Sequence, residues 1–64
     1  MEALLRLQEV QRRTGLCRSA IYEMMKHNQF PKAIALSARS VAWVESEIEQ
    51  WVQGRIVRAR QFSQ

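Results

Sequence analysis

The segment TGLCRSAIYEMMKHN, residues 14–28, contains a tight turn followed by a short amphipathic helix. Gly15 can adopt the positive φ angle that ends a preceding helix. The second helix is expected to begin at Cys17 or Arg18 and to run to about His27, with Asn28 as its stop because asparagine tolerates the left-handed conformation. Its core-facing residues recur at helical spacing: Ile21, Met24 and Met25. Two helices joined by a short turn with glycine form the helix-turn-helix layout.

The other side of this second helix is polar and basic, with Arg18, Ser19, Tyr22 and Lys26. We expect Arg18 to contact a guanine edge or a phosphate of DNA rather than to remain a solvated arginine. For Ser19 two roles stand, a phosphate contact or a bond to the free amides of its own helix. For Tyr22 the alternatives are a phosphate contact and packing under a neighbouring hairpin, and Lys26 is predicted to contact a phosphate.

Before the turn, residues 4–6 predict a short edge strand or an extended lead-in, and residues 7–14 predict a first helix. Leu7 and Val10 are expected to face the core. Arg12 and Arg13 lie near the end of this helix, where they either complement the helix dipole or contact phosphate. The sequence does not decide between these two roles of Arg12 and Arg13.

After the second helix, Phe30-Pro31 requires extended chain because a proline restricts the residue before it. Residues 32–44 then change to the alternating period of a β-hairpin. Its turn, residues 37–40, has no glycine and predicts a type I turn. Such a hairpin with a basic tip serves as the wing of winged helices, so we expect Arg39 and Ser40 to reach a minor groove or the backbone and Lys32 to contact a flanking phosphate.

A third helix is predicted from Glu45 to about Arg55, with glutamates in its first turns and arginines at its far end. Its apolar stripe consists of Val44, Ile48, Trp51 and Val52. Gly54 either ends this helix or lies within a helix that continues through residues 56–58. We therefore divide the chain into a winged helix-turn-helix domain, residues 1–55, and a basic tail or helix extension, residues 56–64. Trp43 and Trp51 are interpreted as core residues rather than as platforms for stacked bases.

The chain has 64 residues and a formal net charge of +4, which predicts one domain with a small core and a polyanionic partner. The charges are segregated, because residues 6–39 are mainly basic and half of the acids lie within residues 45–49. This distribution favours a one-sided basic face over the scattered charges that are common on small soluble proteins.

Catalysis and metal binding are not expected from this composition. There is no aspartate, and the single cysteine and the single histidine lie at opposite ends of one predicted helix, about 15 Å apart. They cannot pair as nucleophile and base, and one cysteine with one histidine is too few for a structural zinc site. We interpret Cys17 as a buried, inert substitute for a cap residue, against the alternative of a redox-sensitive thiol. His27 is interpreted as a capping or surface histidine, and no cofactor is expected.

No segment has the length of a membrane span or the pattern of a signal peptide, so a cytoplasmic protein is expected. Double-stranded DNA is the expected partner, and assembly of several copies on DNA is a further expectation. The competing hypothesis is a protein-interaction module that acts on a recombinase or a response regulator. It rests on residues 56–62, which mix apolar and basic side chains.

Several short motifs, in their order and spacing, resemble the AlpA-type phage regulatory proteins, small members of the MerR-like, excisionase-like winged helix-turn-helix group. These motifs are LRLQEV at 5–10, TGL at 14–16, RSAIY at 18–22, FPK at 30–32, SVAW at 40–43, EI at 47–48 and WV at 51–52. The resemblance implies a mainly α fold of three helices plus a β-hairpin wing. It also implies control of prophage or integrative-element transcription or excision, with the second helix in the major groove and the hairpin near Arg39 as a wing. The sequence departs from the family pattern at Cys17, Ala20 and Ala38.

Overall fold

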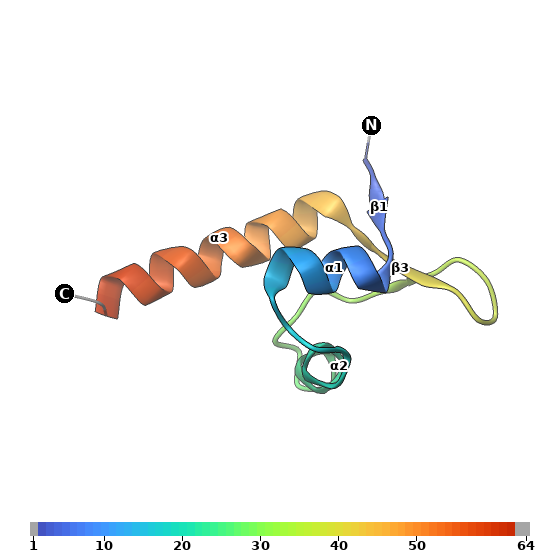
Figure 1. Ribbon diagram of the computed structural model, residues 1–64, viewed down its shortest axis with the longest axis horizontal. Coiled ribbons are helices and arrows are strands. Elements are labelled where there is room, and N and C mark those ends of the chain that lie inside the picture. The colour runs from blue at the N-terminus through green and yellow to red at the C-terminus, as the bar shows by residue number, and fades with distance from the viewer. Residues whose placement is uncertain (1, 63–64) are drawn as a thin grey trace.

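The computed structural model describes residues 2–62, which form three helices and a small antiparallel sheet (Figure 1). The elements in chain order are β1 (Leu4–Leu5), α1 (Leu7–Thr14), α2 (Arg18–Lys26), β2 (Ile34–Ala35), β3 (Val41–Val44) and α3 (Glu45–Phe62). The strand order is β1-β3-β2, so the N-terminal strand and the hairpin form one sheet. This arrangement confirms the predicted winged helix-turn-helix fold.

The turn between α1 and α2 is closed by local hydrogen bonds. Gly15 has a φ angle of 75°, and its amide donates to the carbonyl oxygen of Gln11 at 2.8 Å. The Thr14 hydroxyl donates to the carbonyl oxygen of Val10 at 2.8 Å and accepts from the Leu16 amide at 3.3 Å. The left-handed conformation predicted for Gly15 is confirmed, and these bonds fix the direction in which α2 leaves the turn.

One residue marks each end of α2: Asn28 just after its C-terminal end and Cys17 at its N-cap position. Asn28 has a φ angle of 58°, and the Gln29 amide donates to the carbonyl oxygen of Met24 at 2.7 Å, so the helix ends where the sequence predicted. Cys17 holds the N-cap position in an extended conformation, but its side chain makes no capping bond. The prediction that Cys17 is buried is wrong, because this position places its thiol in solvent.

The core is one cluster to which every helix and two of the strands contribute. Its buried members are Leu5, Val10, Ile21, Phe30, Trp43 and Ile48. Trp43 is fully buried, and its indole N–H donates to the carbonyl oxygen of Pro31 at 3.1 Å. A buried indole requires such a partner. The interpretation of Trp43 as a core residue is therefore confirmed.

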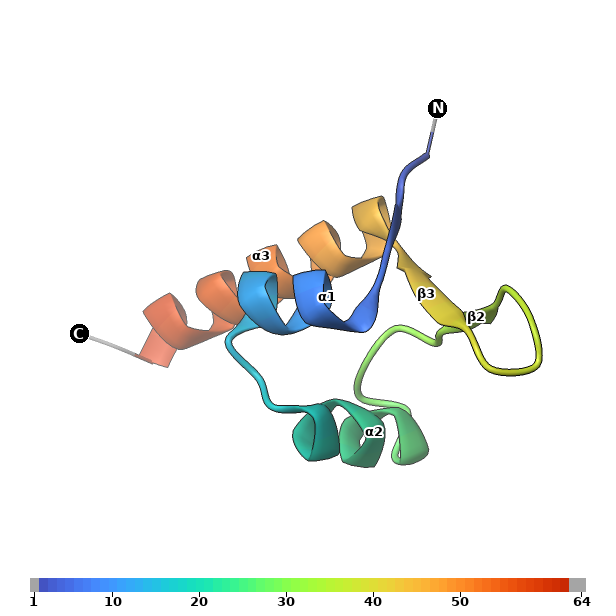
Figure 2. The same ribbon diagram turned by 45° about the vertical axis from the view of Figure 1, so that its right-hand side comes forward.

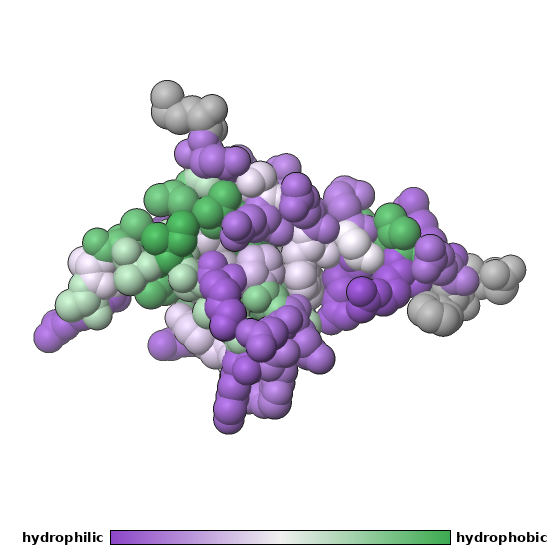
Figure 3. Space-filling view, turned by 180° about the vertical axis from the view of Figure 1, so that it is seen from behind, coloured by the Kyte–Doolittle hydropathy of each residue, from purple (hydrophilic) through white to green (hydrophobic). Residues whose placement is uncertain are grey.

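The register of the sheet decides which apolar side chains face solvent. Leu5 lies opposite Trp43, and Ile34 lies opposite Ala42. Because side chains alternate across a sheet, the face with Leu5 and Trp43 packs on the core, while Leu4 and Ile34 lie on the other face. Leu4 and Ile34 are 47% and 42% exposed. Figure 3 shows an apolar patch on this side of the molecule.

α3 runs without interruption through Gly54 to Phe62, which decides between the two alternatives left by the sequence. Its N-terminal half packs against the sheet and α1, and its C-terminal half projects beyond the core (Figure 1). Among the helices of residues 2–62, none combines the length and the apolar character that crossing a membrane requires.

Gly54→Ala is expected to raise the free energy of unfolding by about 0.5–1 kcal/mol. Glycine is the less stable choice in a helix interior. A Cβ atom at position 54 would meet no other atom within 4 Å, so alanine introduces no clash. Urea titration monitored by circular dichroism measures the change. Gly15→Ala is the matched control and should destabilise the protein, because residue 15 has a positive φ angle. A loss of stability in Gly54→Ala would contradict a continuous α3.

Candidate nucleic-acid interface

The polar side of α2 is exposed, and of its predicted contact residues Tyr22 also packs against the core. Its four predicted contact residues are all exposed: Arg18, Ser19, Tyr22 and Lys26. At 3.6 residues per turn they fall within an arc of about 100° on the helix. In Figures 1 and 2, α2 forms the lower edge of the molecule, below α1 and α3. These side chains are therefore accessible to a partner without any rearrangement of the core.

Tyr22 connects this surface to the core. The edge of its ring contacts Trp43, with a distance of 6.4 Å between ring centroids, and Tyr22 remains 38% exposed. The guanidinium of Arg18 lies over the Tyr22 ring, 5.6 Å from the centroid. Of the two roles considered for Tyr22, packing beside the hairpin is thus present in the structure. Its ring restricts the orientations of Arg18 while leaving the guanidinium donors accessible.

The two ends of the α2 surface differ in their local chemistry. At the N-terminal end, the Ser19 hydroxyl lies 3.3 Å from the sulfur of Cys17. This contact, followed by the Ala20 amide, lowers the pKa of the Cys17 thiol. At the C-terminal end, His27 is a surface residue, as predicted, and its Nε2 lies 2.9 Å from a carboxylate oxygen of Glu23. Glu23 is the one acid on α2, and this contact holds it beside His27.

The tip of the hairpin carries Arg39 in an exposed position. The tip is closed by backbone bonds, in which the amides of Leu36 and Ser37 donate to the carbonyl oxygen of Ser40 at 2.7 and 3.2 Å. Ser40 is half-buried, and its backbone carbonyl closes this loop. Lys32 is exposed but does not lie at the tip. It lines a groove beside α3, together with Arg55 and Arg58.

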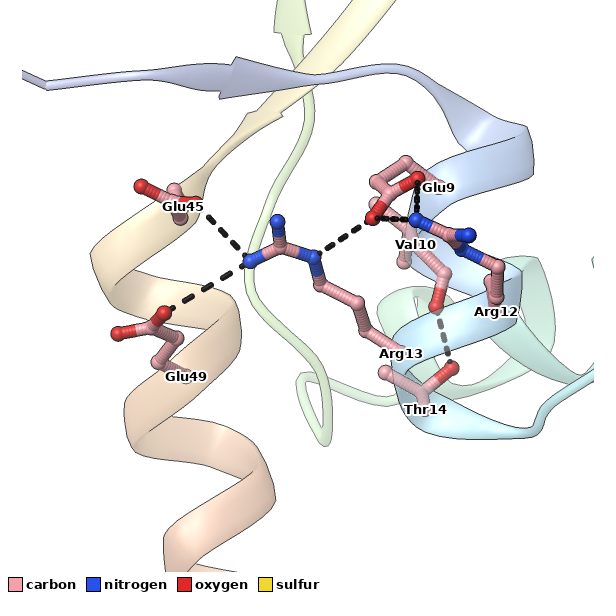
Figure 4. A network of polar contacts seen from close by, with 7 residues as sticks. All are labelled: Glu9, Val10, Arg12, Arg13, Thr14, Glu45 and Glu49. Atoms are coloured by element: carbon pink, nitrogen blue, oxygen red, sulfur yellow. Dashed lines mark hydrogen bonds and ion pairs between the residues drawn. The ribbon is translucent and has the colours of Figure 1, made fainter.

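Arg12 and Arg13 have partners within the protein (Figure 4). Arg12 binds both carboxylate oxygens of Glu9 at 2.9 Å. Arg13 donates from Nε to Glu9 and from Nη1 to Glu45, each at 2.9 Å, and lies 3.7 Å from Glu49. Arg13 therefore ties α1 to the start of α3, which is a structural role. The sequence interpretation missed this clamp, although Glu45 and Glu49 lie one helical turn apart and so share a face.

The ion pairs of Glu9 with Arg12 and Arg13 predict a pH dependence of stability. The contacts of Glu9 with Arg12, and then with Arg13, lower the pKa of this carboxyl below its usual value of about 4.3. A lowered pKa in the folded state stabilises the fold above the unfolded pKa, and this stabilisation disappears as pH falls through the folded value. We expect Glu9→Gln to lower the melting temperature at pH 7 by a few degrees at most, because these ion pairs are partly exposed.

The difference in melting temperature between wild type and Glu9→Gln should shrink as pH falls below the usual carboxyl pKa of about 4.3 and through the lowered pKa of Glu9 in the folded state. Thermal melts across this range measure it. Glu47→Gln, on the exposed part of α3, is the matched control and should show a smaller difference at pH 7. A difference for Glu9→Gln that does not change with pH would contradict the assigned ion pairs.

Comparison with known proteins agrees with this architecture. The family described as Prophage CP4-57 regulatory protein (AlpA) matches residues 3–56, which include both helices of the helix-turn-helix, the sheet and most of α3. The chain belongs to the AlpA family. The resemblance read from the sequence motifs is thus confirmed. All seven predicted contact residues, from Arg18 to Ser40, lie within the part of the chain that matches the family.

Two known proteins show the extent of the similarity. An uncharacterized protein, ORF88, from Enterobacteria phage P4 is 44% identical over 55 residues, which cover 86% of this chain and 62% of the phage protein. The DNA-binding transcriptional activator AlpA of Escherichia coli K12 is 36% identical over 58 residues, covering 81% of this chain and 83% of that protein. The chain thus spans somewhat less than two thirds of the phage P4 relative.

Proposed function

We propose that this AlpA-family protein is a sequence-specific regulator that binds double-stranded DNA in the cytoplasm and controls transcription or excision of a phage, prophage or integrative element. The observation that carries the proposal is the exposed arc of Arg18, Ser19, Tyr22 and Lys26 on α2. This arc lies on the second helix of a helix-turn-helix, the element that enters the major groove in proteins of this class. The name of the E. coli relative, a DNA-binding transcriptional activator, supports the same class of function.

In this proposal the contact residues divide into two groups. Arg18 reads a base edge, because it lies at the N-terminal end of α2 and can bind guanine O6 and N7 together. The others bind the sugar-phosphate backbone and fix the position of α2. These are Ser19, Tyr22, Lys26, Lys32, Arg39 and Ser40. The hairpin lies to one side of α2 (Figure 2), where it serves as a wing against the adjacent backbone or minor groove.

The experiment that tests the proposal is selection of bound duplexes from a random DNA pool, followed by titration of the recovered sequence at several salt concentrations. A sequence motif should emerge, and the spacing of any repeated half-sites reports whether several copies bind together. Three backbone contacts from lysine or arginine predict that log K falls with log salt with a slope of about −3. Recovery of no motif, or an affinity that does not depend on salt, would contradict the proposal.

A protein-interaction module remains the second candidate, and the exposed apolar surface favours it. Leu4 and Ile34 on the outer face of the sheet and Val57 on α3 are all more than 40% exposed. In this alternative, residues 1–55 form the DNA-binding domain and residues 56–64 recruit a recombinase, a response regulator or a further copy. Deletion of residues 56–64 would then abolish assembly while binding to a single DNA site survives.

A further inference from the structure

A groove of about 870 Å³ lies between the C-terminal end of α2 and the middle of α3. Three basic residues line it: Lys32, from the chain that leaves α2, and Arg55 and Arg58, from α3. Across residues 2–62, none of these three cations forms an ion pair with a carboxylate. One acid, Glu47, also lines the groove. It precedes Arg58 by eleven residues, about 16 Å along the helix, so it does not neutralise the basic end.

The floor of this groove is held by tertiary contacts of Trp51. Trp51 donates its indole N–H to the carbonyl oxygen of Gln29 at 2.9 Å, and its ring packs against Phe30 at a centroid distance of 4.8 Å. The guanidinium of Arg55 lies over the Trp51 ring at 4.9 Å. Gly54 adds no side chain to the floor, and a Cβ there would meet open space. Arg55 is thus oriented by an aromatic ring and keeps its donors available for an anion.

The position of the groove relates it to the α2 surface. The C-terminal half of α3 and the hairpin project to opposite sides of the molecule, with α2 between and below them, in both Figure 1 and Figure 2. The longest dimension of the protein, which runs from one projection to the other in Figure 1, is 45 Å. At 3.4 Å per base pair this length corresponds to about 13 base pairs. A duplex that receives α2 in its major groove would therefore meet the hairpin on one side and α3 on the other.

We propose that this groove binds the phosphodiester backbone of DNA on the side of α2 opposite the wing, so that α3 acts as a second arm with Arg58 and Lys32 contacting phosphates and Arg55 supporting them. This inference rests on the proposed function and adds a contact surface to it. Charge selects DNA over a protein partner here, because the groove presents unpaired cations. The large exposed apolar side chains lie elsewhere, over the sheet and on other parts of the surface.

The test compares Arg58→Gln with Arg60→Gln. Both remove one positive charge from exposed positions of α3, but the two residues lie about 160° apart around the helix, and Arg60 does not line the groove. The probe is a 30-base-pair duplex carrying the sequence recovered by selection, and a scrambled duplex of the same composition. Arg58→Gln should weaken binding to both duplexes about five- to tenfold at 0.1 M salt and flatten the salt slope by about 1. Arg60→Gln should leave the slope unchanged.

Shortening the duplex locates the contact. Base pairs are removed stepwise from either end of the duplex. The wing side is the end whose removal lowers the affinity of wild type but not that of Arg39→Gln. Removal from the other end should weaken wild type by the same factor as Arg58→Gln and should not weaken Arg58→Gln further. Lys32→Gln provides a second variant with the same expectation, and circular dichroism confirms that each variant is folded.

Equal effects of Arg58→Gln and Arg60→Gln would overturn the inference, since they would reflect net charge alone. Wild-type affinity in both Arg58→Gln and Lys32→Gln would also overturn it. The inference would also be overturned if Arg58→Gln kept wild-type affinity for DNA but lost binding to a recombinase, because the groove would then bind a protein. Failure of wild type to bind any duplex is a different result, because it rejects the proposed function before the arms are compared.

Discussion

Trp43→Ala is expected to leave most of the protein unfolded at 25 °C. Truncating a buried tryptophan to alanine removes about 3–5 kcal/mol of stability. Domains of fewer than about 70 residues rarely have more than about 3–5 kcal/mol in total. Trp43 is fully buried in β3, next to Leu5 across the sheet and Tyr22 of α2. Its removal therefore empties the centre of the only core cluster in the described residues.

The same substitution also leaves the carbonyl oxygen of Pro31 without the indole N–H that it accepts. Trp43→Phe separates the two contributions, because it keeps most of the ring volume and loses the hydrogen bond. We expect Trp43→Phe to stay folded, with the free energy of unfolding lowered by about 1–3 kcal/mol and a correspondingly lower midpoint in urea. Urea titration monitored by far-ultraviolet circular dichroism measures all variants at one temperature.

Trp51→Ala is the matched control for Trp43→Ala. It is the same chemical change, but Trp51 is only half-buried and packs at the edge of the core, where it contacts Phe30. It should lose less stability than Trp43→Ala and remain folded in water. A cooperative urea transition for Trp43→Ala close to that of wild type would show that the core does not depend on this side chain.

Arg18→Ala is expected to reduce discrimination between the selected duplex and a scrambled duplex by about 1–3 kcal/mol, or roughly 5- to 150-fold. The reason is geometric. Arg18 is the first residue of α2, and its guanidinium is held over Tyr22, whose ring in turn packs against buried Trp43. An arginine held at the N-terminal end of a recognition helix is positioned for a bidentate contact with guanine. Competition titration at one fixed salt concentration measures the ratio of the two affinities.

Lys26→Ala is the matched control for Arg18→Ala. It removes the same charge two helical turns further on. As a phosphate contact, Lys26 should affect both duplexes by the same factor and leave the ratio unchanged. Arg18→Lys keeps the charge but not the fork of donors, so it should restore affinity for the scrambled duplex and not the discrimination. Equal losses on both duplexes in Arg18→Ala would assign Arg18 to a phosphate instead.

Much of the fold can be predicted from the sequence because the relevant signals are local. The first helix was predicted at residues 7–14 and occupies Leu7–Thr14. Gly15 and Asn28 were predicted to adopt left-handed conformations and have φ angles of 75° and 58°. Helical spacing placed Ile21 toward the core and Arg18 toward solvent. Each of these features depends on steric preferences and periodicity within a few neighbouring residues, which the sequence states directly.

Local signals do not resolve features that depend on which partner a residue meets. The alternating hairpin pattern fits two opposite faces, and the pairing of β2 with β3 decided that Ile34 faces solvent while Trp43 is buried. Cys17 was predicted to be buried but is exposed at the N-cap of α2, because burial depends on which segments cover a side chain. The continuation of α3 through Gly54 was one of two alternatives, since a single glycine lowers helix stability only modestly.

The amino-acid order alone therefore determined the first two helices, the turn between them and membership of the AlpA family. Only the folded chain showed that Arg13 joins Glu9 to Glu45, although Glu45 lies 32 positions from Arg13 in the sequence. It also brought Lys32 beside Arg55 and Arg58 in one groove. The physical reason is the same in both cases: ion pairs and grooves form between segments that are distant in sequence, so their partners are set by how the helices pack and not by the spacing of residues along the chain.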